Sequence, residues 1–136
     1  MFYAIKAEVR DPEAETFVFT AQKTMYGGKH IAAGDVLFIF ASENEGGKGL
    51  VAHGTVSRVS AIPKKQAGGR ETPRVSVWVT RRSQARRQLG RKDLKPFTHW
   101  QDGQPETELN FRFYRQATNK IVAISDHTAA FLKKFF

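Results

Sequence analysis

Residues 30–63 read HIAAGDVLFIFASENEGGKGLVAHGTVSRVSAIP, and this stretch decides the fold. The Gly34-Asp35 turn precedes the apolar run VLFIF at 36–40, which is too short for a buried helix and has turn residues on both sides. After a glycine-rich loop, residues 50–62 alternate apolar and polar side chains. A continuous apolar run is typical of a strand covered on both faces, and alternation is typical of a strand with one face in water. The stretch therefore predicts a long hairpin at the centre of a small β-barrel.

Gly54 lies inside the second strand of this hairpin. A glycine weakens strand pairing unless it marks a bulge or a close approach of two backbones. We therefore expect a bulge or a close backbone approach at Gly54, and a sharply coiled strand around it.

Outside the hairpin, alternation with period two predicts strands at 3–9, 74–80 and 109–114, and a short apolar run predicts the last strand at 120–124. Residues 16–20 predict a strand or an extended connector, residues 25–30 a loop or short helical turn, and residues 64–73 a polar, mobile connector. Helix formers at 83–89 predict a short surface helix. A final helix begins near Ser125 or Asp126, which can cap it, and its apolar face should cover one side or end of the barrel. The expected fold is one α+β domain over residues 1–136, a small mixed-strand pseudobarrel with a short surface helix and a C-terminal capping helix.

The charge of the chain is strongly positive and concentrated in one segment. The 136 residues contain 22 Lys and Arg against 13 Asp and Glu, which gives a net charge of +9. Between residues 81 and 95, seven basic residues stand against one acidic residue, so this segment supplies six of the nine excess charges. Such a segment favours a polyanionic partner such as nucleic acid, although a solvated basic face has the same composition. The candidate phosphate-binding residues are Arg81, Arg82, Arg86, Arg87, Arg91, Lys92 and Lys95.

The sequence lacks the motifs of the common enzyme classes. It has no cysteine, no glycine-rich phosphate loop, no Gly-x-Ser-x-Gly elbow and no His-Glu-x-x-His. Its four histidines lack the spacing of a helical metal site, and Ser125-Asp126-His127 fits a helix start better than a catalytic triad. We therefore expect no metal, no cofactor and no catalytic residue. Without a basic leader or a long apolar segment, we also expect a cytoplasmic protein with no membrane partner.

Three aromatic residues stand in or beside polar segments rather than on core-facing alternations: Tyr26, Trp78 and Trp100. Each of these rings could have a structural role in packing. A flat ring at the surface can also stack on a nucleobase, which contributes about 1–3 kcal/mol per base. A cluster of these rings beside Arg and Lys would favour the second role, and only the folded chain can show such a cluster.

The order of these features resembles the PUA-like superfamily, most closely its EVE branch, with the ASCH branch as a neighbour. The resemblance depends on five stretches: Ala33-Gly34-Asp35, Phe40-Ala41-Ser42, Gly54-Thr55-Val56, Tyr114-Arg115-Gln116-Ala117, and the strand at 120–125 followed by a helix. It implies a pseudobarrel that binds RNA or DNA and holds a modified base in a pocket beside the barrel. The pocket residues that it implies are Thr24, Tyr26, Lys29, Phe40 and Ser42, with Arg115 and Gln116.

The residues and the resemblance lead to one hypothesis, a nucleic-acid-binding module for RNA or DNA. Its basic segment would hold phosphates, and an aromatic pocket would hold one unstacked base. Two alternatives stay open: a nuclease or other small hydrolase on the same scaffold, using Lys29, Tyr26 or a histidine, and a protein-interaction module with a basic surface. The sequence leaves the oligomeric state undetermined.

Overall fold

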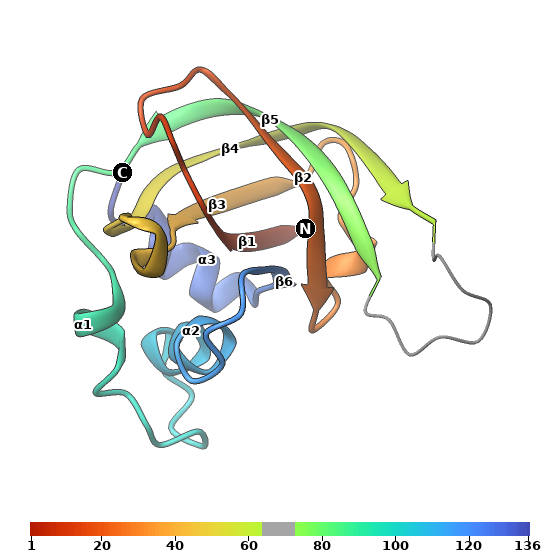
Figure 1. The fold of residues 1–136 in the computed structure, drawn as a ribbon. Coiled ribbons are helices and arrows are strands. Elements are labelled where there is room, and N and C mark those ends of the chain that lie inside the picture. Colours follow the sequence, from red (N-terminus) through yellow and green to blue (C-terminus); the bar gives the residue numbers. More distant parts are fainter. Residues whose placement is uncertain (64–72) are drawn as a thin grey trace.

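The protein is described by a computed structural model that covers residues 1–63 and 73–136. Within these residues, six strands close into a barrel in the order β1-β3-β4-β5-β2-β6 (Figure 1). The strands are β1 (Phe2–Ala7), β2 (Thr16–Met25), β3 (Val36–Ala41), β4 (Gly49–Ile62), β5 (Arg74–Gln84) and β6 (Lys120–Ala123). The β1–β3 and β2–β6 pairs are parallel and the others antiparallel. The predicted α+β mixed-strand pseudobarrel is confirmed.

Helices cover one side of this barrel. They are α1 (Arg91–Leu94), α2 (Pro105–Phe113) and α3 (Asp126–Lys133), and two short 3-10 turns are η1 (Gly28–His30) and η2 (Glu43–Glu45). Figure 1 shows α2 and α3 together on the side of β1 and β6. None of the helices in the described part of the chain is long and apolar enough to cross a membrane.

Two hydrophobic cores result from this arrangement, and β1 belongs to both. Its Ile5 points into the barrel, whereas Ala4 points toward the helices. The predicted strand at 36–40 behaves in the same way, with Ile39 in the barrel core and Phe38 in the helix-side core. Because successive strand residues point to opposite faces, a strand covered on both faces needs apolar residues at nearly every position.

The central hairpin is confirmed, including its irregular second strand. The β4–β5 register shifts between His53 and Gly54. A Cβ atom on Gly54 would collide with the backbone carbonyl of Thr80, so the two strands approach more closely than any side chain would allow. This is the close approach that a glycine within a strand indicates.

The final helix is confirmed, and Ser125 is its cap. The Ser125 hydroxyl accepts a hydrogen bond from the backbone N–H of Thr128 at 3.1 Å. This bond satisfies one of the free N–H groups at the helix start. Leu132 lies fully buried on the face that α3 turns toward the barrel.

The strand predicted at 109–114 is wrong, because residues 109–113 belong to α2 and Tyr114 caps its end. Leu109 and Phe113 are buried, and Phe111 between them is half-buried on another face. A spacing of two residues between apolar side chains fits a strand, but Leu109 and Phe113 also have the i, i+4 spacing of one helical face. Pro105 is a common first residue of a helix, and the acidic residues after it favour the positive end of the helix dipole.

The helix predicted at 83–89 is also wrong. Strand β5 continues to Gln84, and the next backbone N–H groups find partners elsewhere, from Ala85 to the carbonyl of Val51 and from Arg86 to that of Phe135. Residues 16–20 are a strand, and it extends to Met25 with a register shift after Phe19. The predicted connector at 64–73 lies outside the described residues, except for its last position.

Candidate nucleic-acid interface

Tyr26 follows β2 in a backbone conformation that few bulky residues adopt. Its φ of 52° lies in the left-handed region, where a non-glycine residue costs of order 1 kcal/mol or more. The carbonyl of Tyr26 accepts a hydrogen bond from the N–H of Ala123 on β6, and Gly28 behind it lies against the β6 backbone, where a side chain has no room. The pairing with β6 thus holds the strained turn, and it leaves Tyr26 40% exposed.

Arg112 of α2 stacks on this exposed ring. Its guanidinium carbon lies 3.9 Å from the centroid of the Tyr26 ring. The Tyr26 hydroxyl donates to Oε1 of Gln116 at 3.3 Å. Arg112 forms no ion pair with the described residues, and its buried Nε has no hydrogen-bond partner among them. The stack therefore joins an exposed tyrosine to a cation that has no carboxylate partner among the described residues.

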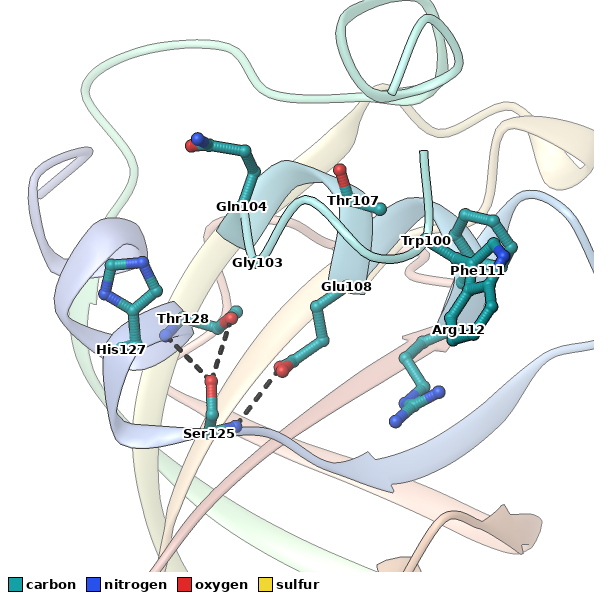
Figure 2. A pocket seen from close by; sticks show the side chains of 10 residues that line it. All are labelled: Trp100, Gly103, Gln104, Thr107, Glu108, Phe111, Arg112, Ser125, His127 and Thr128. Atoms are coloured by element: carbon teal, nitrogen blue, oxygen red, sulfur yellow. Dashed lines mark hydrogen bonds between the residues drawn. The ribbon is translucent and has the colours of Figure 1, made fainter. Parts of the chain in front are cut away.

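A hollow of about 450 Å³ lies beside this stack, between α2 and the start of α3. Figure 2 shows Trp100, Phe111 and Arg112 at one end of it, His127 at the other, and Glu108 between them. Trp100 is 71% exposed.

Arg115 completes the group by lying 5.0 Å above the Phe111 ring. We refer to Tyr26, Trp100, Phe111, Arg112 and Arg115 as the aromatic–arginine surface. Open rings can stack on flat ligands, and guanidinium groups bind phosphate or carboxylate oxygens in pairs.

A second hollow, of about 420 Å³, has four cations in its wall. We call it the basic hollow, and its cations are Lys48, Arg91, Lys92 and Lys95.

Glu43 lies in the wall of the basic hollow and holds Arg91 in place. Its Oε2 accepts the backbone N–H of Arg91 at 2.7 Å, and both of its oxygens lie 3.1 Å from the hydroxyl of Tyr114. Burial, followed by the nearby Glu43 carboxylate, raises the pKa of Tyr114, so this phenol stays protonated as a donor. The side chain of Arg91 is held by Asn44 at 2.7 Å.

The basic segment predicted at 81–95 does not form one surface. Arg91, Lys92 and Lys95 share the basic hollow, but Arg81 donates to backbone carbonyls before β2 and Arg82 donates to Thr55 on β4. Arg86 and Arg87 lie near the end of the chain: the backbone of Arg86 bonds to Phe135, and Arg87 stacks on the Phe135 ring at 4.4 Å. Strand alternation and the turn after β5 separate these cations. Phosphate binding by any of them stays a prediction.

Three of the predicted pocket residues are buried. Phe40 packs against Phe113 with 5.2 Å between ring centroids, and the Thr24 hydroxyl donates to the carbonyl of Pro73 at 2.7 Å. Ser42 is 1% exposed, and its hydroxyl has no partner among the described residues.

Ser42 and Tyr26 attach to opposite ends of β1. The N–H of Ser42 donates to Ala7, whereas Tyr26 bonds to Ala123, the partner of Tyr3. Roughly 13 Å of strand, at about 3.3 Å per residue, separates these two points. Lys29 is exposed in η1. The structure therefore does not gather this predicted set into one group.

Trp78 is separated from the other predicted aromatics. It pairs with Val18 of β2, and Arg58 lies 4.6 Å above its ring. Val18 and Tyr26 lie eight residues apart along the chain, on either side of the register shift that follows Phe19. Tyr26, Trp100, Arg115 and Gln116 are the predicted residues that the structure brings together.

Sequence reasoning missed Phe111 and Arg112. Both lie on α2, which was predicted as a strand, so their place beside Trp100 and Tyr26 was not foreseen. The signal that could have found them is Pro105 followed by Glu106 and Glu108, which is typical of a helix start.

The barrel and its helices match solved structures over nearly their whole length. The DUF55 domain of human thymocyte nuclear protein 1 is 13% identical, with a TM-score of 0.65 over 98% of this chain and 97% of that chain. The chain has the expected PUA-like pseudobarrel fold and shares it with this domain. A second structure of the human protein, in complex with 5-methylcytosine-containing DNA, is 14% identical and has a TM-score of 0.64 over 98% and 95% of the two chains.

The same fold occurs in a bacterial protein. A structure from Pseudomonas putida is 14% identical, with a TM-score of 0.63 over 99% of each chain. No protein-family model and no curated protein sequence matches the chain. At these identities the comparison establishes the fold and leaves the binding chemistry to this chain's own residues.

Proposed function

We propose that this EVE-type domain binds nucleic acid and holds one unstacked, modified base against the aromatic–arginine surface. The observation that carries the proposal is the Arg112 guanidinium, stacked 3.9 Å above an exposed Tyr26 ring and free of carboxylate partners among the described residues. The contact itself contributes about 0.5–1 kcal/mol, which is no more than the left-handed backbone of Tyr26 costs, so stability alone gives little reason to keep the pair. A surface that binds a flat anionic ligand uses both the Tyr26 ring and the Arg112 guanidinium.

Trp100 supports the same proposal. Large aromatic rings dominate buried cores and interfaces, so a tryptophan that is 71% exposed indicates a surface for a partner. Trp100 shares the wall of the 450 Å³ hollow with Phe111 and Arg112. Stacking of a base on such a ring contributes about 1–3 kcal/mol and requires no particular base sequence.

Phosphate contacts would come from the basic hollow. It has four cations, and the nearest acid, Glu43, is already bonded to Arg91 and Tyr114. If all four cations neutralise phosphates of a single strand, the logarithm of the binding constant should fall with the logarithm of salt at a slope of about −3.

The modified base is the finer part of the proposal, and the fold comparison supports it. The human protein with the same fold was crystallised in complex with 5-methylcytosine-containing DNA. A methyl group that enters an apolar contact contributes about 0.8 kcal/mol, which is roughly a fourfold preference over the unmodified base.

A titration of labelled oligonucleotides tests the proposal. Single-stranded and duplex DNA and RNA, each with and without one 5-methylcytosine, are titrated by fluorescence anisotropy at several salt concentrations. We expect binding that weakens with salt and favours at least one methylated strand. Equal binding to heparin and to oligonucleotides would overturn base recognition. Cleavage of the labelled strands by substoichiometric protein would replace the proposal with a nuclease.

A further inference from the structure

Two lysines lie side by side in the covered layer between the barrel and the helices. Lys6 on β1 and Lys120 on β6 are direct partners across the antiparallel pair, and they are 1% and 0% exposed. Like charges that face each other across a sheet destabilise it. Neither lysine forms an ion pair with a carboxylate in the described part of the chain. Such a pair requires another source of stabilisation.

The turn that follows α2 supplies this stabilisation through its backbone. Lys6 Nζ donates to the carbonyls of Phe113 at 2.7 Å and Ala117 at 2.9 Å. Lys120 Nζ donates to the carbonyls of Gln116 and Thr118, both at 3.0 Å. Residues 113–118 therefore wrap around two ammonium groups, and we call Lys6 and Lys120 the lysine clamp.

Stability alone gives little reason to keep this clamp. Burial lowers the pKa of Lys6, and burial together with Lys6 and Arg112 lowers the pKa of Lys120 to about 8, which shows that both charges are held in an unfavourable environment. Buried charges can often be replaced by apolar side chains of similar volume without loss of stability. What two ammonium groups provide, and two apolar chains do not, is a fixed path for the four carbonyls.

That path determines where the ligand-facing side chains lie. The clamped turn begins directly after Arg112, carries Arg115 above Phe111, and presents Gln116 to the hydroxyl of Tyr26. We propose that Lys6 and Lys120 are positioning residues, which set the aromatic–arginine surface by holding the turn at 113–118. This inference depends on the proposed function for its effect on binding, but its structural part can be tested without a ligand.

The first measurement is made on the free protein. The Nε–H proton of Arg112 lies near the face of the Tyr26 ring, so its NMR resonance should carry a ring-current shift. In Lys120→Met we expect that shift to collapse toward the value of an exposed arginine, whereas Lys120→Arg, which keeps a cation, should retain most of it. An unchanged resonance in Lys120→Met overturns the inference, whatever the protein binds.

The second measurement is a double-mutant cycle on oligonucleotide binding. Lys120→Met should weaken binding about fivefold, the effect of roughly one lost hydrogen bond, and should lower the melting temperature by only a few degrees, because two carbonyls lose their donor. In a Gln116→Ala background the same substitution should cost less than about twofold, because the link to Tyr26 is already absent. Equal losses in both backgrounds would show that Lys120 acts without Gln116 and would overturn the positioning role.

The positioning role can still be tested if Lys120→Met does not fold. Lys6→Met then takes its place, since its carbonyl partners belong to the same turn. If neither variant folds, Gln116→Ala in the wild-type background must shift the Arg112 resonance, and an unshifted resonance overturns the inference. Failure of the wild type to bind any oligonucleotide, with the Arg112 shifts as expected, would refute the proposed function and leave the clamp intact.

Discussion

Replacement of Tyr26 by alanine should separate the binding role of this residue from its structural role. The substitution removes a ring that is 40% exposed and the contact with Arg112 at 3.9 Å. A stacked base would lose about 1–3 kcal/mol, so the dissociation constant for an oligonucleotide should rise about 5- to 150-fold. The stability loss should be smaller, because an exposed cation–π contact contributes about 0.5–1 kcal/mol and the left-handed backbone persists in alanine.

The assay pairs anisotropy titration with thermal denaturation. A loss of 1 kcal/mol lowers the melting temperature of a chain of this size by about 3–5 °C, which leaves Tyr26→Ala folded at 25 °C. Tyr26→Phe keeps the ring and loses only the 3.3 Å bond to Gln116, so its affinity should fall about two- to fivefold.

Trp78→Ala is the matched control for this experiment. It also removes an aromatic ring beneath an arginine, Arg58 at 4.6 Å, but on a distant part of the barrel. Its affinity should stay within about twofold of wild type. The reasoning is refuted if Tyr26→Ala binds as tightly as wild type, or if Trp78→Ala weakens binding by as much.

Three further outcomes are expected. Joint replacement of Lys92 and Lys95 by alanine should reduce the salt slope of oligonucleotide binding by about 1.4, while Arg82→Ala, whose side chain bonds within the barrel wall, should leave it unchanged in the same titration. Because the pKa of Lys120 falls to about 8 in the folded chain, the unfolded chain holds the extra proton between about pH 8 and 10, so the free energy of unfolding should rise over this range. Urea denaturation at several pH values should find this rise in the wild type and a smaller one in Lys120→Met. Burial, then the charge of Lys133, lowers the pKa of His53, so the contribution of His53 to stability is present above about pH 6.5 and is lost as the pH falls. In urea denaturation, the free energy of unfolding should therefore fall more steeply with acid in the wild type than in His53→Phe.

The barrel could be predicted from local patterns. The apolar run at 36–40 and the alternation at 74–80 record which faces of a strand are covered, and this information lies within a few residues of chain. The strand predicted at 109–114 failed because Leu109, Phe111 and Phe113 satisfy a period of two while the helix start at Pro105 lies outside that window. Local patterns mislead where two periods fit the same residues.

The sequence by itself determined the barrel, its central hairpin, the cap on α3 and an excess of cations. The tertiary structure alone decided which rings and cations meet. Tyr26 and Gln116 are 90 residues apart, and Lys6 and Ala117 are 111 apart, so their contacts depend on the pairing of β1 and β2 with β6. The physical reason is that burial of a strand face is encoded locally, whereas the neighbours of an exposed side chain are set by the register of strands distant in sequence.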